Sequence, residues 1–375
     1  MYQHGGDVYS HPNFIDFSAN INLLGAPQRV IECAKAAINE ITHYPQVGYH
    51  RLRQAIAELE QVESQQIICG NGAAEVFFTL VSALKPKKAL LYIPTFQEYE
   101  HALKHVNCQI VYEYLREEQG FQIEESQLQQ IDNTIDMVFF CNPNNPTGIL
   151  TRTDFLEQML KICKEVGAVL VVDECFLDFV LATEELYSMK NYLEEYLNLF
   201  IVKAFTKTFG MPGLRLGYGL CKNKIILEKM KSVTQPWNVS VPAQEAGIAA
   251  AQEKNYLIKT RLAVEKEKTF LLEQLLNYQP QVNQMVLLKS SGQETNLEQV
   301  QEKFFIQIYG YAANFIFFKS IINLDLELKT YGILIRNCSN FQGLGEGWYR
   351  IAVRTRKENQ ALIYALEDIR KKYFF

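Results

Sequence analysis

Short hydrophobic segments alternate with longer amphipathic ones along the first two thirds of the chain. Five segments are hydrophobic almost throughout rather than at every second position: QQIIC (65–69), KALLYI (88–93), MVFFC (137–141), AVLVVD (168–173) and NLFIVK (198–203). Helix-like stretches lie between them, at 73–84, 96–106 and 153–167. Strands with this pattern are buried on both faces, as in a parallel sheet with crossover helices. The pattern therefore predicts an α/β fold in which helices flank a mostly parallel sheet.

The pattern changes at about residue 240. Helical stretches come first, a final helix closes the chain, and strand-like segments lie between them at 312–319, 333–337 and 349–355. This order predicts a second, smaller α+β domain at the C-terminal end. We expect three parts: an N-terminal arm that belongs to the small domain (1–41), a large domain (42–238) and the small domain itself (239–375).

Composition excludes several classes of partner. Hydrophobic residues make up 48% and charged residues 21%, as in ordinary soluble globular proteins. The net charge of −5 gives no basic face for nucleic acid, and no hydrophobic run is long enough to span a membrane. The polar N-terminus lacks the apolar core of a signal peptide, and the eight scattered cysteines contain no C-x-x-C motif. We therefore expect a cytoplasmic protein with reduced cysteines and no structural zinc.

Four of the predicted strands are followed by segments that can carry chemistry. They are GNGAAE (70–75), NPNNPTG (142–148), the pair Asp173-Glu174, and the stretch KAFTKTFGMPGLRLGYG (203–219). In open α/β sheets, ligands bind beyond the carboxyl ends of the strands. We therefore expect these four segments to meet at one edge of the sheet.

The residue types in these segments suit one ligand. Backbone N–H groups at the start of the helix after GNG can bind a phosphate, although a plain tight turn explains that segment equally well. Asp173 needs a cation or several donors if it is buried; a helix cap or a structural salt bridge is the alternative. Lys207 and Arg215 stand among small and apolar residues, where charge is costly. A pyridine ring with an aldehyde and a phosphate arm would satisfy Lys207, Asp173 and Arg215 together.

The combination of FTK and GLRLGY with NPNNPTG and VDE resembles the fold-type I, pyridoxal-phosphate-dependent aminotransferases, across essentially the whole chain. The resemblance implies that Lys207 is the catalytic lysine that carries pyridoxal 5′-phosphate (PLP). It implies a homodimer with shared active sites, in which Tyr44 reaches the cofactor phosphate of the neighbouring subunit. Ala204 stands where many relatives have Ser or Thr, so that phosphate contact should be missing. The other cofactor-binding positions implied are Gly72, Ala73, Ala74, Phe96, Asn145, Asp173, Thr206 and Arg215.

Within this family, the chain is similar to the histidinol-phosphate aminotransferase branch and, inside it, to threonine-phosphate decarboxylases of cobalamin biosynthesis. Four segments carry this likeness: HGG (4–6), FSANINLLG (17–25), FQEYEHAL (96–103) and ILIRNCSNFQGL (333–344). Phe176 stands where aminotransferases of the branch usually have a tyrosine, and Leu24 replaces a common proline. Decarboxylation of threonine phosphate and transamination of histidinol phosphate both remain open at this point.

The likeness implies that the substrate is a phosphorylated amino acid. It implies that Arg350 binds the carboxylate end, that Arg336 and His4 bind the phosphate, and that Asn20 also contacts the substrate. Bidentate arginine suits such anions, and the alternative for each arginine is a surface ion pair.

Two other functions are weaker alternatives. His101 and His105 are spaced as zinc ligands can be, but no glutamate follows His101, so we expect a solvent-facing pair and no metal site. A non-catalytic, cofactor-binding regulator of transcription would need a DNA-binding region, for which this chain shows neither room nor a basic face.

Overall fold

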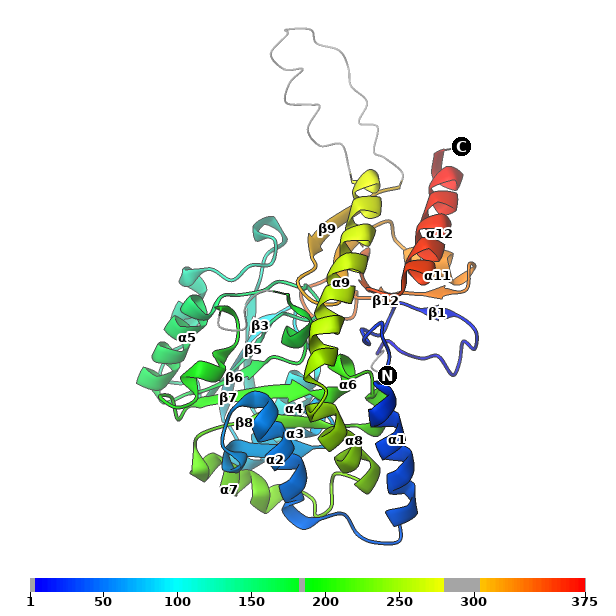
Figure 1. Cartoon of the computed structure of the whole chain (residues 1–375). Coiled ribbons are helices and arrows are strands. Elements are labelled where there is room, and N and C mark those ends of the chain that lie inside the picture. The colour runs from blue at the N-terminus through cyan, green and yellow to red at the C-terminus, as the bar shows by residue number, and fades with distance from the viewer. Residues whose placement is uncertain (1–3, 182–185, 280–303, 375) are drawn as a thin grey trace.

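The computed structural model describes residues 4–181, 186–279 and 304–374, which are built around two main sheets (Figure 1). The larger sheet has seven strands in the order β2-β8-β7-β6-β5-β3-β4. Strand β8 runs antiparallel to both of its neighbours, and all other neighbouring strands are parallel. The prediction of an α/β fold with a mostly parallel sheet is confirmed. The strands are β2 (Ile67–Gly70), β3 (Lys88–Ile93), β4 (Gln109–Tyr114), β5 (Met137–Cys141), β6 (Val169–Asp173), β7 (Leu199–Ala204) and β8 (Gly217–Leu220).

The continuous hydrophobic strands are explained by two cores, one on each face of this sheet. In β5, Val138 and Phe140 belong to one core, whereas Met137, Phe139 and Cys141 belong to the other. Successive side chains of a strand point to opposite faces, so each face requires its own hydrophobic residues. One core includes α3 (Ala73–Leu84), α4 (Glu98–His105) and α7 (Lys224–Val233); the other includes α2 (His50–Glu60), α5 (Thr153–Val166) and α8 (Val241–Ala251).

The second sheet is antiparallel, in the order β12-β13-β10-β9. It packs with α9 (Lys254–Leu275), α11 (Leu324–Lys329) and α12 (Arg356–Phe374) around a third core. The N-terminal β1 (Ile15–Asp16) pairs in parallel with β11 (Ile333–Leu334), next to this sheet. Helix α1 (Gln28–Ala37) packs against α8. The strands of the sheet are β9 (Ile306–Gly310), β10 (Phe315–Ser320), β12 (Arg336–Asn337) and β13 (Trp348–Ala352).

The predicted strands are confirmed in their positions, with one correction. The single strand predicted over 333–337 is two short strands, β11 and β12, which pair with different partners. Strands β1, β4, β8 and β9 were not predicted. The domain boundaries remain a prediction. Among the described helices, none combines the length and the hydrophobicity that crossing a bilayer requires.

The register of the large sheet brings the predicted segments to one level. Cys141 at the end of β5 pairs with Asp173 at the end of β6, and Asp173 pairs with Val202 of β7. The segment NPNNPTG, Asp173 and the segment with Lys207 therefore leave the sheet side by side. In NPNNPTG, both Asn-Pro peptide bonds are cis.

Candidate active site

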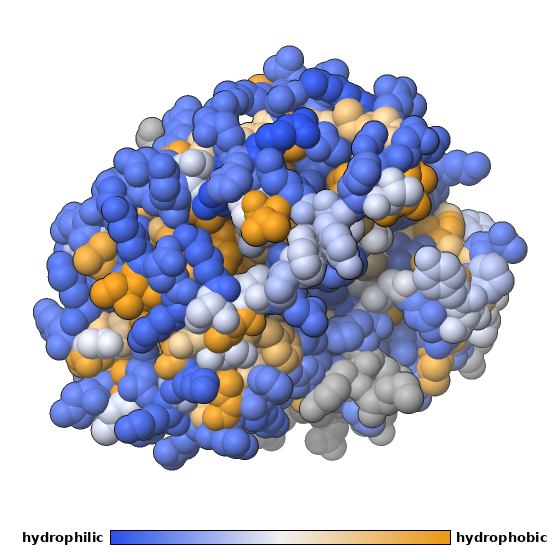
Figure 2. Space-filling view, turned by 90° about the horizontal axis from the view of Figure 1, so that it is seen from below, coloured by the Kyte–Doolittle hydropathy of each residue, from blue (hydrophilic) through white to orange (hydrophobic). Residues whose placement is uncertain are grey.

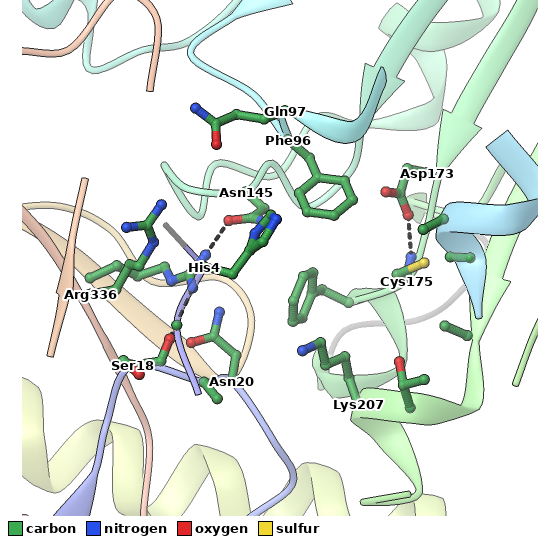
Figure 3. A pocket seen from close by; sticks show the side chains of 18 of the residues that line it. His4, Ser18, Asn20, Phe96, Gln97, Asn145, Asp173, Cys175, Lys207 and Arg336 are labelled. Atoms are coloured by element: carbon green, nitrogen blue, oxygen red, sulfur yellow. Dashed lines mark hydrogen bonds between the residues drawn. The ribbon is translucent and has the colours of Figure 1, made fainter. Parts of the chain in front are cut away.

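A cavity of about 240 Å³ lies where these strand ends meet the N-terminal segment and the second sheet. Figure 3 shows Phe96 and Gln97 on one side, Lys207 and Asn20 on the opposite side, and Asp173 and Arg336 at the two ends. Twelve of the fourteen predicted site residues line it; Gly72 and Tyr44 do not. The twelve are His4, Asn20, Ala73, Ala74, Phe96, Asn145, Asp173, Thr206, Lys207, Arg215, Arg336 and Arg350.

One end of the cavity is a cradle for an anion. Gly72 precedes α3 with φ of +83°, and a Cβ at this position would lie 2.5 Å from Nη2 of Arg215. Glycine is therefore required for the guanidinium to approach the helix start, where the first N–H groups have no partner within the helix. Gly72 thus shapes the cradle without lining the cavity. Arg215 is exposed, so the expectation that it is surrounded by apolar residues is wrong.

Asp173 is the buried carboxylate of the site. Only 5% of it is exposed; its Oδ1 accepts a hydrogen bond from the N–H of Cys175 (2.9 Å) and its Oδ2 accepts one from the hydroxyl of Tyr99 (2.5 Å). Burial raises the pKa of the Asp173 carboxyl. Asp173 forms neither a helix cap nor a structural salt bridge, the two alternatives for a buried carboxylate here. Its partners in the described chain are neutral donors, and no cation pairs with it. A cationic group in the cavity, such as a protonated pyridine nitrogen, would stabilise the charged carboxylate.

Lys207 lies in the short helix α6 (Phe205–Thr208), directly beyond β7. Burial and, next, the charge of Arg350 lower its pKa to about 8 from an ordinary 10.5. A larger fraction of this amine is therefore unprotonated at neutral pH than for an ordinary lysine, which suits a nucleophile toward an aldehyde.

Two buried arginines form the wall opposite Asp173. Arg350 of β13 and Arg336 of β12 are directly paired in register across the two strands. Arg350 donates from Nη1 to Oδ1 of Asn145 and from Nη2 to the carbonyl of Ser18, and its Nε has no hydrogen-bond partner in the part of the chain that the structure describes. Burial lowers its pKa to about 10.

Among the described residues, Arg336 donates only to neutral acceptors, the carbonyl of Asn337 (2.6 Å) and Oδ1 of Asn340 (2.7 Å). Within the described ranges, no carboxylate forms an ion pair with Arg336 or Arg350, so a surface ion pair is wrong for both. Adjacent buried cations without a counter-charge are unfavourable, and an anionic ligand would compensate them.

Asn20 is a further unsatisfied polar group. It is 1% exposed, and within the described residues neither Nδ2 nor Oδ1 has a hydrogen-bond partner. A buried amide without partners costs about 1–3 kcal/mol. Because Asn20 lines the cavity, a ligand is the obvious partner for it (Figure 3).

Tyr44 lies outside the site. It is 77% exposed, and its ring stacks on that of Trp237 with centroids 4.4 Å apart. Ile38, Ile41 and Val47 nearby are also exposed. Seen from below, the surface shows hydrophobic side chains scattered among hydrophilic ones (Figure 2). The predicted contact of Tyr44 with a second subunit stays a prediction.

Several cavity residues had no predicted role: Gly5, Ser18, Ala19, Gln97, Cys175 and Phe341. Apart from Cys175, all lie inside the segments that carried the resemblance, which was the available signal. Of the three departures from the family pattern, Ala204 and Phe176 line the cavity without a hydroxyl, and Leu24 does not line it.

The two histidines of α4 do not form the solvent-facing pair that was expected. His105 is exposed, but His101 is only 15% exposed and its Nδ1 lies 3.4 Å from Oε2 of Glu98. In the part of the chain that the structure describes, no group of three or more His, Cys, Asp or Glu residues is arranged to hold a metal ion.

Comparisons with known proteins identify relatives of the chain in sequence and in structure. Residues 12–366 match the family described as "Aminotransferase class I and II". A threonine-phosphate decarboxylase from Salmonella typhimurium is 31% identical over 98% of this chain and 96% of its own length. An adenosylcobalamin biosynthesis bifunctional protein from Leptospira interrogans is 29% identical over 98% of this chain but only 41% of its own length. The solved structure of a histidinol-phosphate aminotransferase from Clostridium acetobutylicum has a TM-score of 0.83 and 29% identity, and covers 96% of this chain and 99% of that one.

Proposed function

Because this chain belongs to the class I and II aminotransferase family of PLP-dependent enzymes, as its motifs predicted, we propose that it decarboxylates L-threonine O-3-phosphate. The products are carbon dioxide and aminopropanol phosphate. The observation that carries the proposal is the buried pair Arg336 and Arg350, which has no carboxylate partner in the described chain and lies across the cavity from Asp173. The pair suits a substrate with two anionic groups.

The cavity fits PLP, since the cradle that only a glycine at position 72 permits suits a phosphate, and the buried Asp173 has no cationic partner in the described chain. Ala73, Ala74, Thr206 and Arg215 would hold the phosphate. Asp173 would hold the ring nitrogen, Phe96 would cover the ring, Asn145 would meet the ring oxygen, and Lys207 would carry the cofactor. Bound there, PLP supplies an electron sink for a bond broken at the substrate Cα.

The remaining residues of the cavity would bind and orient the substrate. Arg350 would bind the carboxylate, Arg336 and His4 the phosphate, and Asn20 a polar group between them. Loss of carbon dioxide requires the bond from Cα to the carboxylate to be held perpendicular to the cofactor ring, which depends on small differences in placement. Lys207 Nζ is the group that would deliver the proton to Cα after the carboxylate has left.

Transamination of histidinol phosphate is the second candidate. The likeness to the Clostridium acetobutylicum aminotransferase favours it. Phe176 favours decarboxylation, because it cannot offer the hydroxyl that aminotransferases of this branch usually place there. The likeness to the Salmonella typhimurium decarboxylase supports the same choice, and the Leptospira interrogans relative supports a role in cobalamin biosynthesis.

One experiment separates the two reactions. PLP-loaded protein is incubated with L-threonine O-3-phosphate, and separately with histidinol phosphate and 2-oxoglutarate, while carbon dioxide and glutamate are measured. We expect carbon dioxide and aminopropanol phosphate in equal amounts in the first reaction, and little glutamate in the second. Brisk glutamate formation without carbon dioxide release would reject decarboxylation. Lys207→Ala is the control, and it should abolish either reaction.

We also propose a cytoplasmic homodimer. The eight free cysteines, seven of them buried, suit a reducing compartment. The exposed Tyr44 suits a residue that reaches the cofactor phosphate of a second subunit. Sedimentation of the wild type and of Tyr44→Ala, together with the PLP affinity of each, tests both points. A monomer that binds PLP normally would contradict the shared site.

A further inference from the structure

Glu98, the first residue of α4, is a carboxylate held between two imidazoles. Its Oε1 lies 3.2 Å from Nε2 of His4, and its Oε2 lies 3.4 Å from Nδ1 of His101. The side chain of Glu98 is 17% exposed and does not line the cavity, whereas His4 does. The hydrogen bond from His4, first among several causes, lowers the pKa of the Glu98 carboxyl, which therefore stays charged at neutral pH. Glu98 thus contacts the site through His4.

The backbone beside His4 is fixed independently of Glu98. A Cβ on Gly5 would lie 2.3 Å from the carbonyl oxygen of Ser18, so this segment rests directly on Ser18. The N–H of Gly6 donates to Oγ of Ser18 (2.8 Å), and that hydroxyl donates to Oδ1 of Asp16 (2.6 Å). These contacts bring His4 to the cavity, but they leave its ring free to turn. In the described chain, the contact with Glu98 is the one that orients the imidazole.

The residue before Glu98, Gln97, supports a second residue of the cavity, Arg336. Nε2 of Gln97 donates to the carbonyl of Asn340 (2.6 Å), and Oδ1 of Asn340 accepts from Nη2 of Arg336 (2.7 Å). The start of α4 therefore contacts His4 directly and Arg336 through one intermediate residue. These two side chains are the ones that the proposed function assigns to the substrate phosphate.

We propose that Glu98 is a positioning residue that makes the site selective for a phosphorylated substrate, because it holds the His4 imidazole toward the phosphate. Gln97 supports Arg336 through Asn340. The inference rests on the proposed function. A carboxylate near a phosphate binding site is unfavourable unless its charge is compensated, and the two imidazoles compensate Glu98.

The test compares Glu98→Gln with the wild type, both loaded with PLP. Binding of L-threonine O-3-phosphate, histidinol phosphate and L-threonine is followed by the change in cofactor absorbance, and turnover is measured for the first. We expect Glu98→Gln to raise the Kd for both phosphorylated ligands and the KM of the first about 10-fold, with kcat within about twofold and the Kd for L-threonine unchanged. Glu98→Asp should restore part of the loss.

Two controls separate positioning from a structural role. Glu100→Gln makes the same change two residues along α4, where Glu100 pairs with Lys104 away from the cavity, and it should leave all three Kd values unchanged. In a His4→Gln background, Glu98→Gln should have little further effect. Thermal unfolding of each variant is recorded in parallel.

The proposal is overturned if Glu98→Gln weakens L-threonine and its phosphate ester equally, if it weakens neither, or if its effect persists in full without His4. Absence of carbon dioxide release, with phosphate-selective binding that is lost in Glu98→Gln, would reject only the proposed decarboxylation. A wild type that binds neither phosphorylated ligand would reject both proposals.

Discussion

Lys203 and the pair Arg336 and Arg350 are buried to similar extents, but their surroundings differ. Lys203 of β7 is 4% exposed and forms ion pairs with Glu60 (2.8 Å) and Asp178 (3.2 Å). In the described structure, the two arginines donate hydrogen bonds only to neutral acceptors and form no ion pair. A buried charge whose partners are all present is part of the folded structure, whereas a buried charge that lacks one indicates a missing ligand.

The same contrast holds for two asparagines close together in the N-terminal segment. Asn22 is buried, and its Nδ2 donates to the carbonyl of Thr208 (2.7 Å) and to Oγ1 of Thr260 (2.8 Å). Asn20 is buried to the same degree, and its side chain has no hydrogen-bond partner among the residues that the structure describes. Asn22 therefore stabilises the fold, and Asn20 is available to a ligand.

We expect the largest loss of stability from a substitution of Lys203. In Lys203→Met, the carboxylate of Glu60 would remain buried with a neutral donor, the hydroxyl of Tyr218, and the longer ion pair to Lys190 (3.6 Å), so we expect the free energy of unfolding to fall by about 3–5 kcal/mol. Urea denaturation followed by circular dichroism measures it. Adding Glu60→Gln should recover part of the loss. A variant as stable as the wild type would show that this network does not stabilise the fold. The proposed difference between Lys203 and the two arginines would then be wrong.

Arg350→Met should give the opposite result. Removing a buried cation without a carboxylate partner should leave the unfolding free energy of the apoprotein unchanged or slightly higher. The kcat/KM for L-threonine O-3-phosphate should fall about 100- to 1000-fold, because a charged hydrogen-bonding group is lost opposite the substrate carboxylate. Denaturation and steady-state kinetics on the same preparation measure the two quantities. Loss of stability without loss of activity would assign Arg350 a structural role.

The sequence predicted the strands whose residues form a clear local pattern of hydrophobic positions. Strand β5 was predicted with its observed bounds because both of its faces are buried. Strand β4 was missed because it lies at the edge of the sheet and its residues are only half-buried or exposed. Strand β8 was missed because it contains Gly217 and Gly219; a Cβ on Gly219 would lie 2.4 Å from the ring of Phe200. Glycine is required there by packing and lowers the strand signal.

The site followed the same rule. Motifs predicted the residues that line the cavity, since each follows a strand or lies in a recognisable segment. The pairing of His4 with Glu98 joins residues far apart in the chain, and no periodicity or spacing indicates it. The sequence likewise does not indicate that Arg336 has no carboxylate partner in the described chain, because that depends on which residues the fold places around it.

Asn20→Leu and Asn22→Leu are two matched variants that test whether the two buried asparagines have different roles. For Asn22→Leu, we expect a loss of about 2–3 kcal/mol in unfolding free energy, because the carbonyl of Thr208 and the hydroxyl of Thr260 lose a donor. For Asn20→Leu, we expect no loss of stability and about a 10-fold increase in KM for the phosphorylated substrate. Equal losses of stability in the two variants would contradict the assignment of Asn20 to a ligand.

The smallest expected effect concerns the pH at which Lys207 loses its proton. Its pKa of about 8, compared with an ordinary 10.5, means that the folded apoprotein releases this proton before the unfolded chain does. Between these two values the unfolded state binds more protons, so the contribution of Lys207 to stability increases as the pH rises from about 8 to 10.5. The rate at which the apoprotein attaches PLP should follow the unprotonated amine and reach half of its maximum near pH 8. Stopped-flow absorbance measures that rate.

The Arg350→Met variant also tests how the uncompensated charge of Arg350 affects the pKa of Lys207. The charge of Arg350 is the second cause of the lowered pKa of Lys207, after burial. Removing it should move the midpoint of the PLP attachment rate to higher pH, while Lys203→Met, at a lysine whose charge is already compensated, should leave the midpoint unchanged. An unchanged midpoint in Arg350→Met would mean that burial alone sets the pKa of Lys207. The uncompensated arginine would then act on the substrate without tuning the lysine.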